Sequence, residues 1–209
     1  MARQLYLYPV WIRLWHLVNA LLFLILIFTG ISMQFAGSGR SFSLIRFDQA
    51  VAWHNTSAII LTFNYVIFVL GNIFTTNSRH YSIKKKNFWS DLLAQLKFYS
   101  FGMFKKEKHP FPITYEQKFN PLQKISYVLA MYFGMPVIII TGIGLLFPEI
   151  LVRQFLGVSG LLITDILHIA VGFILSIFML IHIYTCTLGD KPTTLFKSMI
   201  NGYHEEHEE

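Results

Sequence analysis

Residues 161–188 decide the fold, and they read LLITDILHIAVGFILSIFMLIHIYTCTL. A helix needs about 20 mainly apolar residues to cross a bilayer, and this stretch is long enough. It nevertheless contains His168 and His182. Side chains that ionise or coordinate metals are costly inside a membrane and usually have a function. The sequence therefore predicts a membrane span that presents two functional histidines.

Three other stretches are similarly long and apolar. The predicted spans cover residues 14–35, 50–74, 122–147 and 161–188. Of the 209 residues, 54% are hydrophobic and only 13% are charged, whereas a soluble domain carries about 25% charged residues. This composition excludes a soluble enzyme and a disordered chain. We expect an all-α integral membrane protein, a four-transmembrane-helix bundle forming a single domain over residues 1–209.

The first apolar stretch is predicted to be a retained span. Its apolar run is too long for a signal peptide, and no small-residue cleavage site follows it. Fourteen of the 17 Lys and Arg residues lie in the N-terminus, between spans two and three, or in the tail. The other three, Arg40, Arg46 and Arg153, lie in the loops 36–49 and 148–160. By the positive-inside rule, both termini and the segment 75–121 are expected in the cytoplasm.

The segment 75–121 is predicted to hold an amphipathic helix in the headgroup layer. The residues that carry this pattern recur at helical spacing: Trp89, Leu92, Leu93, Leu96 and Tyr99. A solvated basic loop is the alternative. The net charge is +6, and the basic residues that produce it flank the apolar runs. Membrane lipid rather than nucleic acid is therefore the expected partner. We expect an interfacial belt of Trp11, Trp15, Trp53 and Tyr127, a disordered tail over His204–Glu209, and no internal repeat.

The predicted topology assigns a depth to each of four membrane histidines. His16 opens span one and His182 lies near the end of span four, so both are expected at the cytoplasmic level. His54 opens span two and His168 lies near the start of span four, so both are expected at the external level. His168 and His182 are fourteen residues apart, which puts them on one helix face about 21 Å apart.

Two histidines from different helices at one depth are what six-coordinate haem b requires. The four histidines therefore predict two stacked b haems, with the histidines as iron ligands. Zinc would want a third or fourth ligand nearby, and a proton relay would want carboxylates. Only Asp165 lies near either level. The one cysteine, Cys186, excludes covalent c-type haem and a cysteine-held iron–sulfur cluster within this chain.

Three other residues are candidates for haem contact. Gly30 lies fourteen residues after His16 and leaves room for the external haem, as Gly172 could on span four. Close packing of small residues is the alternative for both. Arg13 shares a face with His16 and could pair with a haem propionate, or it could simply extend to the membrane surface.

Several motifs at the starts of the spans, together with the histidine pair of span four, resemble those of a known family. They are Trp11, Arg13 and His16 opening span one, Trp53–His54 opening span two, Phe119-Asn120-Pro121-Leu122-Gln123-Lys124 leading into span three, and His168 with His182. The chain resembles the four-span di-haem cytochrome b subunits of respiratory formate dehydrogenases, NiFe hydrogenases and thiosulfate reductases.

The resemblance implies a role for each site. His16 and His182 would bind the cytoplasmic haem, and His54 and His168 the external one. A quinone, menaquinone or ubiquinone, would bind near Asn120 and Gln123. Both are polar groups at the bilayer edge that can hydrogen-bond a quinone headgroup or cap the helix. An external iron–sulfur or multihaem subunit would be the partner, in the bacterial cytoplasmic (inner) membrane.

The expected function is that of a membrane-anchor cytochrome b subunit carrying electrons between quinone and an external redox partner. The sequence has no nucleotide-binding motif, catalytic triad, or cysteine set for molybdenum or nickel. Substrate chemistry is therefore assigned to another chain. One alternative is a stand-alone di-haem oxidoreductase passing electrons from a small external reductant, such as superoxide, to quinone. A non-redox scaffold with structural histidines is a third reading.

Overall fold

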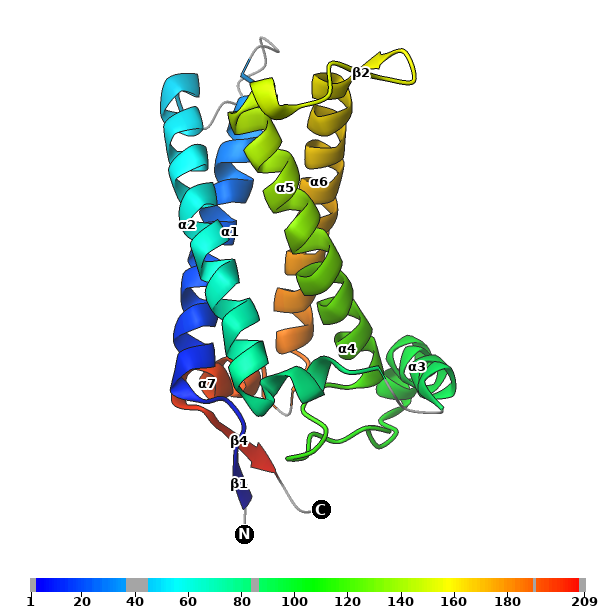
Figure 1. Cartoon of the computed structure of the whole chain (residues 1–209). Coiled ribbons are helices and arrows are strands. Elements are labelled where there is room, and N and C mark those ends of the chain that lie inside the picture. The colour runs from blue at the N-terminus through cyan, green and yellow to red at the C-terminus, as the bar shows by residue number, and fades with distance from the viewer. Residues whose placement is uncertain (1–2, 37–44, 84–86, 190, 207–209) are drawn as a thin grey trace. The chain divides into compact units, whose positions relative to one another are not determined.

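Four long helices dominate the computed structural model, which describes residues 3–36, 45–83, 87–189 and 191–206 (Figure 1). The helices long and apolar enough to cross a membrane are Val10–Gln34, Phe47–Phe74, Pro121–Leu146 and Gly160–Cys186. They coincide with the four predicted spans to within a few residues, which confirms the all-helical membrane fold. Arg40 and Lys84–Lys86, which entered the charge count, lie outside the described residues.

The first, second and fourth spans are single α-helices: α1 (Val10–Gln34), α2 (Phe47–Phe74) and α6 (Gly160–Cys186). The third span is composite, with α4 (Pro121–Val128), the wide-turned η4 (Leu129–Gly134) and α5 (Met135–Leu146). Pro136 lies at the start of α5 and has no N–H for the preceding turn. A local π-helical turn is a common way to accommodate such a break.

Contacts divide the chain into two compact units. The terminal unit contains residues 1–13, 71–133 and 181–209, and the span unit contains residues 14–70 and 134–180. The prediction of a single domain over the whole chain stays a prediction.

In the span unit, α1 and α2 are joined by a reciprocal pair of hydrogen bonds. Trp15 Nε1 donates to the Asn64 carbonyl at 2.9 Å, and Asn64 Nδ2 donates to the Trp15 carbonyl at 3.3 Å. Trp15 also stacks on Phe68, which is fully buried, with ring centroids 4.7 Å apart. Trp15 is therefore a core residue, and its assignment to the interfacial belt was wrong. Its indole N–H needs an acceptor once buried, and Asn64 supplies one.

The span unit also contains a short hairpin between α5 and α6. It follows η5 (Pro148–Ile150) and pairs β2 (Gln154–Phe155) with β3 (Val158–Ser159). The two residues of its turn, Leu156 and Gly157, have φ of 52° and 82°. Positive φ at both positions is what a tight two-residue hairpin turn requires.

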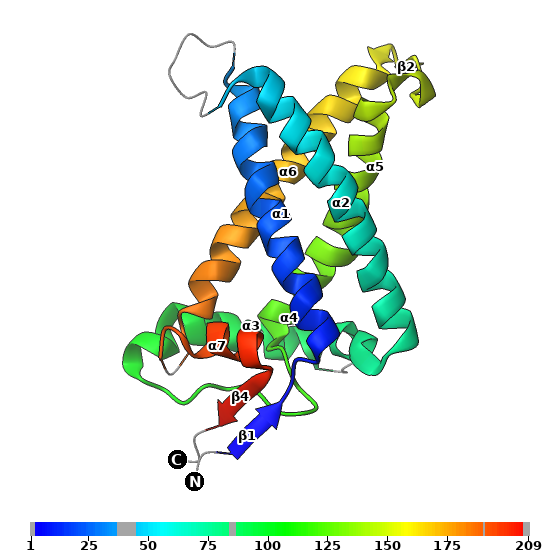
Figure 2. The ribbon, with the colours of Figure 1, turned by 90° about the vertical axis from the view of Figure 1, so that its left-hand side faces the viewer.

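In the terminal unit, the two ends of the chain form a two-stranded ribbon (Figure 2). Strand β1 (Arg3–Tyr6) pairs antiparallel with β4 (Tyr203–Glu206), which follows the short helix α7 (Thr194–Asn201). Gly202 ends α7 with φ of 92°, and a Cβ there would lie 2.8 Å from the Tyr6 ring, so glycine is required. The expectation of a disordered tail was therefore wrong for residues 204–206, because pairing with the distant N-terminus orders them.

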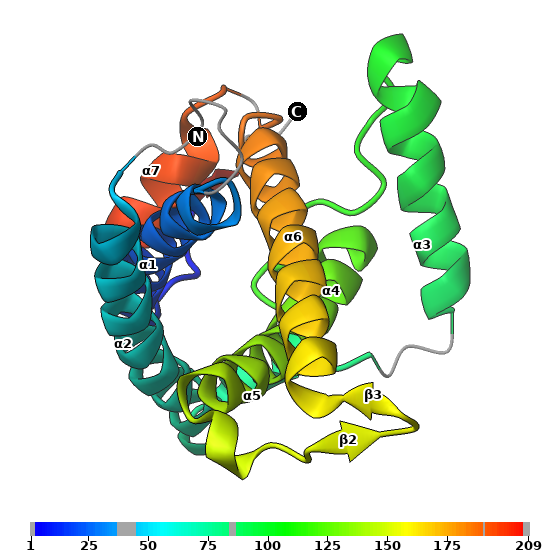
Figure 3. The same cartoon turned by 90° about the horizontal axis from the view of Figure 1, so that it is seen from above.

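The remainder of the terminal unit follows α2. It contains η1 (Thr76–Tyr81), α3 (Phe88–Lys97), η2 (Phe98–Gly102) and η3 (Met103–Lys105). Helix α3 lies against α4 and runs crosswise to it (Figure 3). Phe88 and Gln95 on α3 are buried, whereas Trp89 and Leu93 are 71% and 67% exposed. The predicted amphipathic helix therefore exists, and Trp89, Leu93 and Leu96 of its apolar stripe are exposed. Of the other two stripe residues, Leu92 is half-buried and Tyr99 lies beyond α3, in η2.

Candidate functional site

The span unit brings together His54 of α2 and His168 of α6, the pair predicted at the external level. Their ring centroids are 6.3 Å apart, and the ring planes are inclined by 67°. A bond from a metal to an imidazole nitrogen is about 2 Å, so two imidazoles on opposite sides of one metal have centroids roughly 6 Å apart. The observed separation therefore matches what one bis-histidine haem iron requires.

A threonine on a neighbouring helix contacts each of these two rings. Thr29 Oγ1 on α1 lies 2.9 Å from His54 Nδ1, and Thr141 Oγ1 on α5 lies 2.9 Å from His168 Nδ1. Each hydroxyl also donates to a backbone carbonyl of its own helix, Ile25 at 2.7 Å and Val137 at 2.8 Å.

These contacts fix the tautomer of both histidines. A threonine hydroxyl has one hydrogen and two acceptor lone pairs. Because that hydrogen is donated to the helix carbonyl, the oxygen accepts from the imidazole Nδ1–H. Nδ1 is then protonated, and Nε2 keeps its lone pair. Neutral imidazole with a bonded Nδ1–H is the usual state of a metal-ligating histidine, so the residues suit a haem here.

A glycine follows each threonine beside the histidine ring, and the approach is close enough to disfavour a side chain at Gly142 but not at Gly30. A Cβ at Gly30 would lie 3.7 Å from His54 Cε1, and one at Gly142 would lie 3.3 Å from His168 Cε1. Gly30 is therefore beside the predicted external ligand, as expected from its depth. Its predicted role in making room for a haem stays a prediction, and a Cβ at Gly172 would contact only the Ile138 side chain, at 3.7 Å.

The threonines and Gly142 are residues that the sequence reasoning missed. Their signal was a short repeat in the first and third spans, Ile27-Phe28-Thr29-Gly30-Ile31 and Ile139-Ile140-Thr141-Gly142-Ile143. Each copy precedes a helix that carries an external-level histidine. The expectation of no internal repeat was therefore wrong at this short scale.

The histidines predicted at the cytoplasmic level belong to different units. His182 lies in the terminal unit, where Tyr127 Oη is 3.2 Å from its Nδ1 and Cys186 Sγ is 4.0 Å from its Nε2. His16 lies in the span unit beside Trp15, with ring centroids 6.4 Å apart. Their pairing on one haem stays a prediction. Tyr127 contacts a predicted ligand, so its assignment to the interfacial belt was wrong.

The other predicted site residues make contacts of their own in the terminal unit. A guanidinium nitrogen of Arg13 donates to the Ile200 carbonyl in the last turn of α7, where carbonyls lack helical partners. Asn120 and Gln123 form a reciprocal capping box at the start of α4: Gln123 N donates to Asn120 Oδ1 at 2.9 Å, and Asn120 N donates to Gln123 Oε1 at 3.2 Å.

The side-chain amides of Asn120 and Gln123 differ in whether their N–H donors are already hydrogen-bonded. Asn120 Nδ2 donates to Tyr99 Oη at 3.2 Å, and Asn120 is buried. Gln123 is partly exposed, and its amide nitrogen makes no hydrogen bond to the residues that the structure describes. Capping, the alternative weighed for this pair, is therefore present, and the Gln123 amide N–H groups are the donors open to a ligand.

No three His, Cys, Asp or Glu side chains gather as a metal-ion site within residues 3–36, 45–83, 87–189 and 191–206. The two histidines that the span unit brings together within those ranges are His54 and His168, and a threonine contacts each of them.

Comparison with known proteins gives two findings. Residues 7–202 match the family model described as prokaryotic cytochrome b561. The chain is also 38% identical over 203 residues to the Escherichia coli (strain K12) protein named "Putative cytochrome YdhU", covering 97% of this chain and 76% of that protein. With the family model matching nearly the whole chain, this multi-pass membrane protein belongs to the prokaryotic cytochrome b561 family, the di-haem membrane cytochromes b of hydrogenase and formate dehydrogenase type.

Proposed function

We propose that this cytochrome b is the membrane-anchor subunit of a respiratory complex and carries electrons across the bilayer between a quinone pool and an external redox partner. Membership of the cytochrome b561 family makes the chain a membrane electron carrier and implies haem b. The ligands, the quinone site, the partner and the orientation are parts of the proposal. The Thr29–His54 and His168–Thr141 arrangement is the observation that carries it.

His54 and His168 are the proposed ligands of the external haem. Their Nε2 atoms are the available coordinating atoms because Thr29 and Thr141 accept the Nδ1–H hydrogens. The threonines hold both rings in orientation, and Gly142 allows the His168 ring to lie against α5. When bound, a b haem supplies reversible one-electron oxidation and reduction of its iron.

His16 and His182 are the proposed ligands of the cytoplasmic haem. The Tyr127 hydroxyl next to His182 Nδ1 serves there as the orienting group that threonine provides for the other pair. The quinone is proposed to bind on this side, with the exposed amide of Gln123 as a donor and Asn120 holding Gln123 in place through the capping box. Arg13 is proposed to pair with a haem propionate while it keeps its hydrogen bond to the Ile200 carbonyl.

Haem content tests the ligand assignment. A pyridine haemochrome assay on the purified protein should give two b haems per chain, both low-spin in the visible and EPR spectra. His168→Ala should remove the external haem alone, and His182→Ala the cytoplasmic haem alone. His109→Ala is the matched control, because His109 lies outside the spans, and it should keep both haems. One haem in the unmodified protein, or two in either ligand variant, would contradict the assignment.

Copurification tests the subunit assignment. Gentle detergent extraction from the native membrane should bring down an iron–sulfur or multihaem protein in fixed ratio with this chain. A chain that purifies alone and reduces quinone with superoxide would instead support the stand-alone oxidoreductase.

A further inference from the structure

Two buried basic side chains lie together in the terminal unit. Lys118, just before α4, is 4% exposed, and His80, in η1, is 8% exposed. Arg79 adjoins them, and its Nε donates to His80 Nε2 at 3.4 Å. None of these three residues has a role in the proposed haem or quinone sites.

Among the residues that the structure describes, no carboxylate balances the positive charges of Lys118 and Arg79. Lys118 Nζ lies 4.5 Å from the centroid of the Tyr8 ring, and the Arg79 guanidinium lies 5.6 Å from that of Tyr115. Neither forms an ion pair with any carboxylate whose position the structure describes. Aromatic faces attract cations weakly, whereas buried charges normally have an ionic partner.

The electrostatics of the cluster agree with an unbalanced positive charge. Burial, and then the nearby Arg79 charge, lowers the pKa of Lys118 to about 8. Burial, and then the charges of Lys118, Arg79 and Lys124, lowers the pKa of His80 to about 4. His80 Nδ1 is buried and has no hydrogen-bond partner. A bound anion would relieve this repulsion.

A hollow opens beside the cluster, and its lining is rich in donors. It is a shallow, open hollow lined by Thr76, Ser78, Arg79 and Ser82. Three hydroxyls and a guanidinium are the donor set that oxygen atoms of a phosphate group accept from. Arg79 lines the hollow, and its charge also lowers the pKa of buried Lys118.

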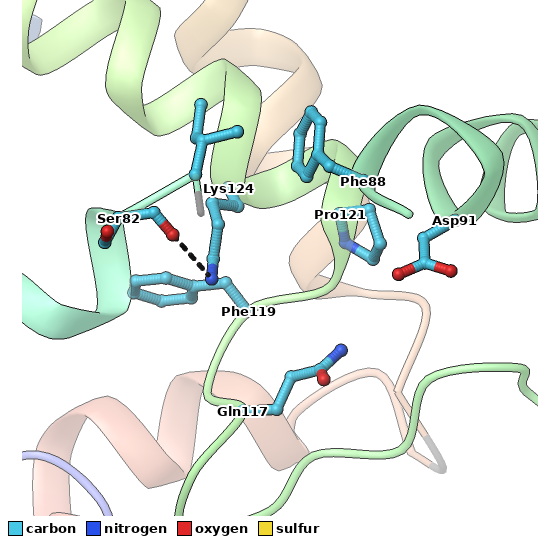
Figure 4. A pocket seen from close by; sticks show the side chains of 8 residues that line it. Ser82, Phe88, Asp91, Gln117, Phe119, Pro121 and Lys124 are labelled. Atoms are coloured by element: carbon cyan, nitrogen blue, oxygen red, sulfur yellow. Dashed lines mark hydrogen bonds between the residues drawn. The ribbon is translucent and has the colours of Figure 1, made fainter. Parts of the chain in front are cut away.

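A second, much smaller pocket adjoins the hollow and shares Ser82 with it. Lys124 lines this pocket together with Asp91, and its Nζ donates to the Ser82 carbonyl at 3.4 Å (Figure 4). Asp91 is the one carboxylate among the described lining residues of these two pockets, and it lines the small pocket with Lys124. The described lining of the hollow itself contains no carboxylate.

The hollow lies at the end of a membrane span. Helix α2 ends at Phe74, two residues before Thr76, and Ile73 and Phe74 on its last turn are exposed apolar side chains. Phospholipid phosphates lie at this depth, with acyl chains beside such side chains, and basic pockets there bind anionic headgroups.

We propose that Thr76, Ser78, Arg79 and Ser82, backed by buried Lys118, form a binding site for a phosphate group at the membrane edge. The phosphate is carried by an anionic phospholipid or is free in solution. The site is independent of the haem ligands and of which way the chain crosses the membrane.

Lipid binding to the purified haem-loaded protein tests the proposal. After delipidation in neutral detergent, native mass spectrometry should show saturable binding of added phosphatidylglycerol, and bound lipid should raise the midpoint of thermal unfolding. Arg79→Gln should weaken this binding about tenfold or more, because a charge-assisted hydrogen bond is lost. Ser78→Ala should weaken it about two- to tenfold without any change in charge.

Lys97→Gln is the matched control, since it removes the same charge from exposed α3 and should change binding less than twofold. Inorganic phosphate can be added in place of the lipid. If it raises the midpoint of thermal unfolding of the unmodified protein and does not raise that of Arg79→Gln, the phosphate site is supported and its ligand is free phosphate. Equal weakening by Lys97→Gln and Arg79→Gln would overturn the proposal, because general surface charge would then explain binding. Absence of saturable binding by both ligands would overturn it as well.

Discussion

At the scale of single residues, a threonine hydroxyl decides which nitrogen of His54 and of His168 is available. Thr29 and Thr141 both donate to a carbonyl of their own helix and accept from a histidine on another helix. Without the acceptor, an imidazole Nδ1–H would be buried without a partner. Groups that orient metal-ligating histidines typically affect metal affinity 10- to 100-fold, as an order of magnitude.

Thr141→Val should therefore weaken haem binding at the external site about 10- to 100-fold. Valine keeps the shape of the side chain and removes the acceptor of the His168 Nδ1–H. Haem titration of the apoprotein, with EPR of the bound low-spin centre, measures the effect. Thr62→Val is the control, because the one bond of the Thr62 hydroxyl within the described part of the chain goes to the Ala58 carbonyl of its own helix. Equal haem affinity in the two variants would refute the orienting role of Thr141.

Gln123→Glu tests the quinone proposal at the same scale. The substitution keeps the oxygen that accepts from Asn120 N and removes the amide N–H donors. We expect quinone-coupled turnover to fall about 5- to 150-fold, the cost of about 1–3 kcal/mol for an unpaired polar group, with both haems still bound. Steady-state rates with a soluble quinone analogue, measured beside the haem spectrum, provide the test.

Asn120→Leu is the companion variant. It should also impair turnover, and it should in addition destabilise α4 by about 1 kcal/mol because the helix cap is lost. Unchanged rates in both variants with intact haems would place the quinone elsewhere, most simply at the external level near His54.

At the scale of elements, α3 presents three different faces. Phe88 and Gln95 face the protein, Trp89, Leu93 and Leu96 form an exposed apolar face, and Ser90, Ala94 and Lys97 form an exposed face without large apolar side chains. A helix with this division is suited to lie at the boundary between protein, lipid and water.

Spin labels at neighbouring positions of α3 should distinguish lipid from water. A label at Leu93→Cys should be accessible to oxygen, which concentrates in lipid, and one at Ala94→Cys to a water-soluble nickel chelate. Cys186→Ser serves as the background, because Cys186 is the one native cysteine. If both labels favoured the nickel chelate, α3 would be a solvated helix and the interfacial location would be wrong.

At the scale of the whole molecule, the unequal distribution of Lys and Arg predicts the orientation. The pairing of β1 with β4 places both ends of the chain in one unit, as four spans require. Trypsin added to spheroplasts should therefore spare the bonds after Lys97, Lys105 and Lys108. Inverted membrane vesicles are the control, and there the same bonds should be cut. Cleavage in spheroplasts would reverse the topology and the assignment of each histidine pair to a side.

The sequence by itself determined the four spans and the amphipathic helix, and it predicts the depths of the four histidines. These features depend on hydrophobic length and helical period, which are properties of neighbouring residues. It also contained the family resemblance, which the comparisons confirm.

Only the tertiary structure decided which groups orient the histidines and order the chain ends. Thr29 and His54 are 25 positions apart, Tyr127 and His182 are 55 apart, and Arg13 and Ile200 are 187 apart. Such contacts depend on how separate elements pack, so no local pattern specifies them. Trp15, Tyr127 and the tail were misassigned for this physical reason: the distant partner that buries or orders each one appears only when the chain is folded.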